Sequence, residues 1–153
     1  MTFEDDDGIR IKDWMLPNRG LVAIPESFGY ITLSGNLNLY DNQLVSLPES
    51  FGSITVGGDL NLNNNRLVTL PESFGSITVR RNLSLNNNQL ASLPESFGSI
   101  TVGGNQNLYG NQLVSLPESF GSITVGGEVS LRNNPLEHPA DIVRRYRRLK
   151  FTY

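Results

Sequence analysis

A repeat of constant length organises most of this chain. Five pairs of an aliphatic residue and a proline stand 23 residues apart: Ile24-Pro25, Leu47-Pro48, Leu70-Pro71, Leu93-Pro94 and Leu116-Pro117. A fixed period in the twenties indicates a solenoid, in which each unit buries its apolar side only by stacking on a neighbour. We therefore expect one elongated domain, with five repeats over 21–137 between an N-terminal cap over 1–20 and a C-terminal capping helix over 138–153.

Each repeat contains three local patterns. Leu60-Asn61-Leu62 alternates apolar and polar residues, as in a strand with one buried face, and Ile54-Thr55-Val56 alternates in the same way. Ser46-Leu47-Pro48-Glu49 has the form of a capping box, and a proline is tolerated in a first helical turn. The sequence thus predicts an α/β solenoid with a parallel front sheet, short helical or 3₁₀ turns and extended back segments.

Two kinds of residue recur at the same place in every repeat. The phenylalanine column is Phe28, Phe51, Phe74, Phe97 and Phe120, and the asparagine column is Asn42, Asn65, Asn88, Asn111 and Asn134. Stacked coils would bring the rings together as a buried spine. Inward amides can satisfy the backbone of their own coil and of the next one. Both columns are therefore interpreted as structural.

Two further columns have local explanations. The glutamates Glu26, Glu49, Glu72, Glu95 and Glu118 have the composition of a cation site. Each also precedes a helical turn, where a carboxylate is favoured, so we expect a capping role and no metal. Gly52 and its equivalents stand where a left-handed end to the turn would be tolerated.

The two ends depart from the repeat. Ile9-Arg10-Ile11 copies the alternation of Leu60-Asn61-Leu62, so Trp14, the single tryptophan, is expected to cover the open end of the core. The acidic run before it is interpreted as a solvated tail. In the C-terminal cap, apolar residues share one helical face and arginines the other. The apolar residues are Ile142, Val143, Tyr146 and Leu149.

Composition limits the classes of function. The net charge of −3 and the pI near 5.1 argue against binding to nucleic acid or membranes, because both need a basic surface. The chain has no cysteine and no apolar run of the roughly 20 residues that span a bilayer, and it begins with an acidic segment. We expect an intracellular protein that is a monomer or a weak homo-oligomer.

The sequence offers no catalytic constellation. His138 is the single histidine and stands at the start of the terminal helix. Catalysis needs one specialised group of residues, whereas these repeats are nearly copies of one another. We therefore expect no enzymatic activity, no cofactor and no small-molecule substrate.

The repeat resembles the leucine-rich repeat family, in its short Leu-Pro form with 23 residues. The matching residues of one unit are Leu60, Leu62, Asn65, Leu67, Leu70, Pro71, Phe74 and Ile77, and the pattern covers about 21–137. The resemblance implies a right-handed superhelix that acts as a scaffold, with protein partners held on its front, concave sheet. The LPESFGSITVGG units are also similar to leucine-rich repeat proteins of large DNA viruses of protists, which would place the protein in a host cytoplasm.

Two positions depart from the family pattern. The pattern wants a leucine three residues before Leu60, where this chain has Gly57, and Val56 is expected to fill the core instead. Gln106 stands at the inward position of Leu60 and Leu83. Either its amide is buried and satisfied, or its strand is displaced.

The outward positions of the front strands supply the candidate partner-binding residues. They are Tyr40, Asp59, Asn61, Asn63, Arg81, Asn82, Asn86, Asn107, Tyr109 and Arg132. Tyrosine and arginine are favoured at the centre of interfaces, so protein binding by this face is the leading hypothesis. The asparagines could equally do no more than solvate the sheet.

Two alternative functions use other surfaces. A row of outward threonines at the 23-residue period suggests recognition of a repetitive surface, such as ice or a polysaccharide. The row is Thr32, Thr55, Thr78, Thr101 and Thr124. The arginine-rich terminal helix suggests docking to an anionic partner.

Overall fold

Parallel strands of two or three residues line both sides of every coil. The structure is a computed structural model that describes residues 10–152. The front sheet contains, from the N-terminal to the C-terminal end of the stack, β2 (Trp14–Met15), β4 (Leu37–Asn38), β6 (Leu60–Asn61), β8 (Leu83–Ser84), β10 (Gln106–Asn107), β12 (Glu128–Ser130) and β13 (Lys150–Thr152). The back sheet contains β1 (Arg10–Ile11), β3 (Thr32–Leu33), β5 (Thr55–Val56), β7 (Thr78–Val79), β9 (Thr101–Val102) and β11 (Thr124–Val125).

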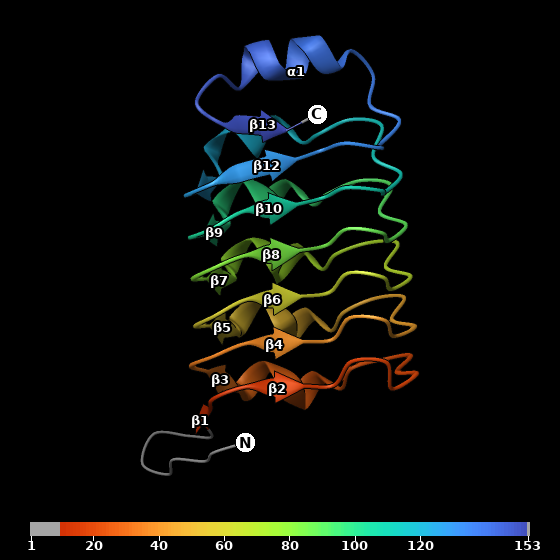
Figure 1. The fold of residues 1–153 in the computed structure, drawn as a ribbon, viewed down its shortest axis with the longest axis vertical. Coiled ribbons are helices and arrows are strands. Elements are labelled where there is room, and N and C mark those ends of the chain that lie inside the picture. The colour runs from red at the N-terminus through yellow and green to blue at the C-terminus, as the bar shows by residue number, and fades with distance from the viewer. Residues whose placement is uncertain (1–9, 153) are drawn as a thin grey trace.

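The 23-residue period appears as the register of both sheets. Leu60 pairs with Leu83 on the front, and Thr55 pairs with Thr78 on the back. Identical positions of successive repeats therefore lie side by side, with one residue buried and the next facing outward. Figure 1 shows the coils stacked in sequence order, with the front strands toward the viewer and the terminal helix at one end. The predicted α/β solenoid, with a parallel front sheet, short turns and extended back segments, is confirmed.

One 3₁₀ turn joins the front and the back of each coil. The turns are η1 (Glu26–Tyr30), η2 (Glu49–Ser53), η3 (Glu72–Ser76), η4 (Glu95–Ser99) and η5 (Glu118–Ser122). In η2 the Phe51 N–H donates to the Pro48 carbonyl at 3.0 Å, and the Ile54 N–H donates to the Phe51 carbonyl at 3.2 Å. The expected short helical turn is therefore present.

The expected capping box is wrong. Pro48 is the N-cap of η2, with no side-chain cap, and Ser46 lies two residues before it. Glu49 is consequently the first residue of the turn and not the third, and the N-cap residue Pro48 has no N–H that a glutamate could accept. Its Oε1 instead accepts the N–H of Ser73, one coil further on, at 2.9 Å. Glu26, Glu49 and Glu95 thus bind backbone N–H groups of the next coil and do not cap their own turns.

The left-handed conformation that the sequence would tolerate at the end of each turn is not adopted there. Gly52 is buried, and the described glycines with positive φ are Gly20 and Gly110. A Cβ atom at Gly52 would lie 2.1 Å from the carbonyl oxygen of Ser73. The position requires a glycine because successive 3₁₀ turns approach closely, and not because of its backbone conformation.

The phenylalanine column forms the predicted spine. Successive ring centroids lie 6.0–6.2 Å apart, and each ring from Phe51 to Phe120 is fully buried. Trp14 packs on Phe28 at 4.8 Å, and Tyr146 packs on Phe120 at 5.9 Å. The expected role of Trp14 as a cover for the open end is therefore confirmed, and Tyr146 has the same role at the other end.

The asparagine column forms the predicted ladder. The Asn65 amide donates to the carbonyls of Leu39 and Leu62 at 3.0 Å each, and its Oδ1 accepts the Leu44 N–H at 3.1 Å. Asn42, Asn88, Asn111 and Asn134 repeat the arrangement. Each amide thus satisfies backbone N–H and C=O groups of two coils at a corner where these groups form no sheet hydrogen bonds.

Neighbouring phenylalanine rings of the spine are nearly parallel. The planes of neighbouring phenylalanine rings differ by only 1–7°. Strand pairing on the back as well as on the front sets the same coil spacing on both sides. The stacking is therefore regular along the whole spine; the concavity that the resemblance implies for the front sheet stays an expectation.

The two departures from the family pattern are resolved in different ways. Val56 is fully buried, as expected for the residue that replaces the missing leucine. Gln106 is also fully buried, and β10 keeps its register with Leu83 and Val129, so the strand is not displaced. Yet neither polar atom of the Gln106 amide has a hydrogen-bond partner among the described residues. Gln106 is therefore buried as the first alternative expects and its strand is not displaced, but no described residue satisfies its amide.

The N-terminal cap is built differently from the expectation. Arg10–Ile11 pairs with Thr32–Leu33 on the back, and Trp14–Met15 pairs with Leu37–Asn38 on the front. Arg10–Ile11 therefore belongs to the back sheet and is not a copy of the front strand, which begins only at Trp14. The acidic run Glu4–Asp7 and Ile9 lie outside the described residues.

The C-terminal cap contains a short helix and a strand. The helix expected over 138–153 is formed only at α1 (Pro139–Arg145), and β13 then extends the front sheet. Tyr146 and Leu149 are buried, while Ile142 and Val143 are half-buried. None of the helices in the described part of the chain is long and apolar enough to cross a membrane.

Two arginines of the cap hold it to the last repeat. Arg145 forms an ion pair with Glu118 at 2.8 Å, and Arg148 donates to the carbonyls of Gly121 and Ile123. The hydrogen bond to the Glu118 carboxylate, together with Tyr146, raises the pKa of the Arg145 guanidinium. Part of the arginine-rich face thus contacts the last repeat, whereas the sequence suggested that this face would be a free charged surface.

Candidate functional site

The side chains that face outward from the front strands, and those just beyond them, form three columns that we call the front surface. The first column is Asn36, Asp59, Asn82, Asn105 and Glu128; the second is Asn38, Asn61, Ser84, Asn107 and Ser130; the third is Tyr40, Asn63, Asn86, Tyr109 and Arg132. Parallel pairing in register sets these columns side by side. All of their members are half-buried or exposed.

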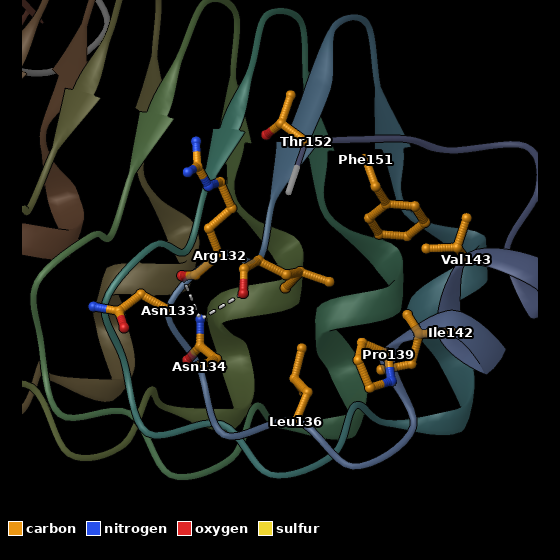
Figure 2. Close-up of a pocket in the computed structure, with 10 residues that line it drawn as sticks. Arg132, Asn133, Asn134, Leu136, Pro139, Ile142, Val143, Phe151 and Thr152 are labelled. Atoms are coloured by element: carbon orange, nitrogen blue, oxygen red, sulfur yellow. Dashed lines mark hydrogen bonds between the residues drawn. The ribbon is translucent and has the colours of Figure 1, made fainter.

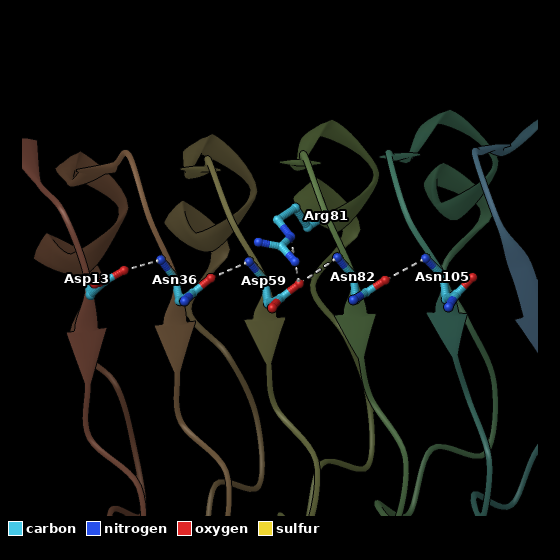
Figure 3. Close-up of polar contacts among 6 residues, drawn as sticks. All are labelled: Asp13, Asn36, Asp59, Arg81, Asn82 and Asn105. Atoms are coloured by element: carbon cyan, nitrogen blue, oxygen red, sulfur yellow. Dashed lines mark hydrogen bonds and ion pairs between the residues drawn. The ribbon is translucent and has the colours of Figure 1, made fainter.

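The first column is a second ladder between coils. The Asn36 Oδ1 accepts the N–H of Asp59 at 2.8 Å, and the Asp59 Oδ1 accepts the N–H of Asn82 at 3.0 Å. Asp13 begins this ladder and Asn105 continues it to Glu128. Figure 3 shows the side chains oriented alike along the sheet. The predicted binding residues Asp59 and Asn82 therefore use one oxygen each within the fold.

The second column forms turns within its own coil. The Oδ1 atoms of Asn61 and Asn107 accept the N–H of the residue two positions later, at 3.3 and 2.9 Å. Such Asx turns direct the chain out of the strand and toward the corner. Their amide nitrogens make no hydrogen bond with other described residues, so Asn61 and Asn107 keep donors for a partner.

The third column carries the large side chains of the front surface. Tyr109 is 38% exposed and Arg132 is exposed on the next coil, while Tyr40 is half-buried. No described hydrogen bond or ion pair uses the side chains of these three residues. Asn86 likewise has no side-chain bond, and the Oδ1 of Asn63 is buried without a described partner. The third column is thus a part of the front surface whose side chains are not used in hydrogen bonds between coils.

Arg81 lies beside the first column. Its Nε stands 3.9 Å from the Asp59 Oδ1, and 69% of its side chain is exposed. Figure 3 shows the guanidinium above Asp59. An exposed ion pair at this distance contributes little to stability. The arginine therefore remains accessible to a partner, and it adds positive charge to the middle of the front surface.

Titratable groups do not gather into a reactive centre in the described part of the chain. Among residues 10–152, no three histidine, cysteine, aspartate or glutamate side chains come close enough to hold a metal ion. His138 is exposed, with a left-handed backbone (φ 52°), at the start of α1. Glu49 and Glu95 bind backbone N–H groups of the next coil.

The threonine row lies on the back sheet in register. Thr32 pairs with Thr55, Thr55 with Thr78, and Thr101 with Thr124. Thr32, Thr101 and Thr124 are exposed, whereas Thr55 and Thr78 are half-buried. The row is therefore regular in position but not equally accessible along its length.

Sequence reasoning missed two surfaces. Valines at one position of the repeat form an exposed column on the side of the stack: Val22, Val45, Val68 and Val114, 41–61% exposed. Their 23-residue spacing was a signal that could have identified them. An apolar pocket lies between the last repeat and the C-terminal cap (Figure 2). No local sequence signal marks this pocket, because the cap folds back onto the repeat only in three dimensions.

Comparison with known proteins agrees with the repeat seen in the structure. The family model described as Leucine Rich Repeat matches residues 59–77 and 81–100, which run from β6 through η3 and from β8 through η4. A solved leucine-rich repeat protein of Leptospira interrogans is similar, with 19% sequence identity and a TM-score of 0.35. The similarity covers 87% of this chain and 52% of that protein, so this chain spans about half of its length. No curated protein matches the sequence.

Proposed function

We propose that this leucine-rich repeat solenoid is a protein-interaction scaffold that binds its partner on the front surface. The proposal rests on a difference in hydrogen bonding between the first and third columns of the front surface. The oxygens of the first column are used between coils, whereas the side chains of Tyr109 and Arg132 are exposed and make no described hydrogen bond or ion pair within the fold. The partner is therefore expected to centre on the C-terminal half of the third column.

The chemistry of this region fits a protein partner. Tyr109 offers an aromatic ring with a polar end, and Arg132 offers five donors in a planar group. Both residue types are enriched among interface residues that dominate binding energy. Asn86 and Asn107 lie next to them with free amide donors, which suits the polar rim of an interface.

Affinity capture with two matched variants tests this proposal. Wild type, Tyr109→Ala and Tyr30→Ala are each used to capture proteins from native lysate, followed by quantitative mass spectrometry. Tyr30 is a suitable control because it is 83% exposed but lies in η1, away from the front surface. A partner that binds the front surface is expected to lose about 30-fold or more in affinity with Tyr109→Ala and to be unaffected by Tyr30→Ala.

Two results would count against protein binding at this surface. One is that no protein is enriched by wild type over Tyr109→Ala. The other is that both tyrosine variants lose the same partners, which would indicate non-specific adhesion of exposed aromatic rings.

A second candidate function is recognition of a repetitive surface by the threonine row. The in-register pairing of Thr32, Thr55, Thr78, Thr101 and Thr124 favours it, because it repeats one hydroxyl per coil at the strand spacing of about 4.7–4.9 Å. Thermal hysteresis and glycan-array measurements test it, with Thr101→Lys as the disrupting variant. Blank results in both assays would remove this candidate.

The arginine-rich cap is a weaker candidate for docking an anionic partner. Arg144, Arg145 and Arg148 already contact Asp141, Glu118 and backbone carbonyls of the last repeat. A partner would have to compete with these contacts. Binding to heparin that does not change between low and physiological salt would exclude it.

Three expectations from the sequence belong to this proposal: the location, the viral similarity and the oligomeric state. An intracellular location rests on the absence of cysteine, and the viral similarity rests on the LPESFGSITVGG units. The monomeric or weakly associating state is tested by light scattering across a range of protein concentrations. Mass that rises to a defined oligomer at micromolar concentration would contradict it.

A further inference from the structure

A polar hollow lies between the corners of the last two coils, directly after the third column of the front surface. We call it the corner notch. Asn111 and Asn134 on its inner side belong to the inward asparagine ladder, whereas no described hydrogen bond uses the side chains of Gln112 and Asn133. The notch has a volume of about 360 Å³, and its lining is Gly110, Asn111, Gln112, Asn133, Asn134 and Pro135.

The notch exists because one column of the repeat lacks a side chain there. This corner column follows the third column by one residue and consists of Asp41, Asn64, Asn87, Gly110 and Asn133. All five residues have a left-handed backbone, with φ between 56° and 70°. Asparagine and aspartate tolerate this conformation, so the backbone does not require a glycine in the fourth coil. The effect of the glycine is the missing side chain.

The side chains of the corner column form an exposed ladder before the notch. The Asn64 Nδ2 donates to the Asp41 Oδ1 at 2.8 Å, and the Asn87 Nδ2 donates to the Asn64 Oδ1 at 2.9 Å. An ionised carboxylate only accepts hydrogen bonds, so Asp41 fixes the direction of both amides. Asn87 therefore presents its oxygen, an acceptor, to the next coil.

The glycine leaves the amides on both sides of it without partners. A Cβ atom at Gly110 would lie 2.5 Å from the Asn87 Oδ1, so this oxygen lies over the empty position. No hydrogen bond among residues 10–152 uses this oxygen or the amide of Asn133. Figure 2 shows the Asn133 side chain directed away from the terminal helix. The notch thus has an acceptor on one side and an amide that can donate on the other.

A primary carboxamide has the chemistry of the missing group. Its nitrogen donates to the Asn87 Oδ1 and its oxygen accepts from the Asn133 Nδ2, as an asparagine at residue 110 would do. Equivalent atoms of Asn87 and Asn133 are two coils apart, which is roughly 9.5 Å at the usual strand spacing. A single hydroxyl oxygen with two hydrogen bonds of about 2.8 Å reaches only one side. A carboxylate has no donor for the Asn87 oxygen.

The notch adjoins the residues that are proposed to centre the front-surface contact. Tyr109 directly precedes Gly110, and Arg132 directly precedes Asn133. A partner segment that covers Tyr109 therefore passes beside the notch. Glutamine suits the entry better than asparagine, because its carboxamide lies one methylene further from the backbone of the partner.

We propose that the corner notch binds the side-chain carboxamide of a glutamine in the protein partner. The carboxamide takes the position of the absent side chain of residue 110 and links the amides of Asn87 and Asn133. The partner is a protein that covers Tyr109, and in this respect the site rests on the proposed function. The partner segment beside the tyrosine is thus expected to carry a glutamine.

Selection of displayed random heptapeptides on wild type, with counter-selection on Gly110→Asn, tests the proposal. Gly110→Asn fills the notch with a carboxamide of the chain itself, and the left-handed backbone accepts an asparagine. The Asn87 oxygen is the end of a flexible side chain and can shift to accept the new bond. The variant is expected to melt at the temperature of wild type or above it. Peptides enriched on wild type alone are expected to contain glutamine.

Affinities of one selected peptide identify the group that enters the notch. Replacing the peptide glutamine by methionine keeps the length of the side chain but removes both hydrogen bonds, and it is expected to weaken binding about tenfold. Replacement by glutamate, which has no donor for the Asn87 oxygen, is expected to weaken binding at least about threefold.

Variants of the protein locate the same site. Gly110→Asn is expected to weaken binding of the selected peptide at least about tenfold, because the notch is filled. Asn133→Gly removes the donor and permits the same backbone, and it is expected to weaken binding about threefold or more. Ser99→Asn is the matched control: it introduces an asparagine into the same coil, at the exposed last residue of η4, and is expected to bind as wild type does.

Three results would overturn the proposal. The first is that no peptide is enriched on wild type over Gly110→Asn. The second is that the enriched peptides have no excess of glutamine. The third is that the methionine and glutamine peptides bind equally well.

Tyr109→Ala separates failure of this site from failure of the proposed function. A captured protein that is lost with Tyr109→Ala but binds Gly110→Asn as well as wild type supports the front surface and overturns the notch. A protein that is lost with both variants supports both. Equal capture by wild type and both variants overturns both.

Discussion

Replacing Gln106 by leucine is expected to stabilise this protein. Gln106 stands at the inward position of β10, between Leu83 of the preceding coil and Val129 of the following one. It is fully buried, and its Oε1 and Nε2 atoms have no hydrogen-bond partner in the described part of the chain. Leucine has a similar volume and already occupies the equivalent positions of β4, β6 and β8 without any exposure. The substitution therefore removes a polar group without leaving a cavity.

The magnitude follows from the cost of an unsatisfied buried amide. Leaving such a group without partners costs about 1–3 kcal/mol, and burying an apolar side chain in its place adds to the gain. We expect Gln106→Leu to raise the free energy of unfolding by about 2–3 kcal/mol. For a chain of this length, that corresponds to a rise in melting temperature of about 5–10 °C.

Urea unfolding followed by circular dichroism measures this change, and Gln89→Leu is the control. Gln89 is exposed, so its replacement is expected to change the free energy of unfolding by less than about 0.5 kcal/mol. A Gln106→Leu variant no more stable than wild type would refute the reasoning. It would mean that the amide is satisfied in solution by buried water or that β10 differs from the arrangement described.

Two further substitutions test what joins the coils. Asn88→Ala is expected to lower the free energy of unfolding by about 3–5 kcal/mol in a urea titration. The substitution removes two hydrogen bonds that the Asn88 amide donates and leaves the Leu67 N–H without an acceptor. A loss no larger than that of Gln89→Ala would contradict the ladder. Gly75→Ala is expected to destabilise by about 1–3 kcal/mol or more, because its Cβ would lie 1.8 Å from the Ser96 carbonyl oxygen. The thermal melt of exposed Ser76→Ala is its control, and equal melting temperatures would contradict the close packing of the 3₁₀ turns.

Repetition made the interior of the fold predictable. Because the units have equal length, any residue repeated at the 23-residue period must stand beside its copies, whichever way the coils are built in detail. The phenylalanine spine, the asparagine ladder and the buried role of Val56 followed from this reasoning and were confirmed. The end cover by Trp14 was also confirmed, although it was inferred from the non-repeating N-terminal segment.

The failures concern contacts whose partner lies in another coil. Glu49 was assigned to its own helical turn, because local spacing cannot show that Ser73 of the next coil presents a closer N–H. Gly52 was interpreted as a position that tolerates a left-handed end, because a close approach between turns has the same sequence signature as a positive φ. For the candidate site, the outward columns could be read from the alternation, but not the use of Asp59 and Asn82 oxygens between coils.

The sequence by itself determined the period, the inward residues and the register, because periodic spacing converts directly into neighbours in space. Only the tertiary structure decided which polar side chains the stack uses and where the C-terminal cap leaves a pocket. These properties depend on distances of a few ångströms between coils and on how a non-repeating segment folds back. Neither is encoded in the spacing of residues along one repeat.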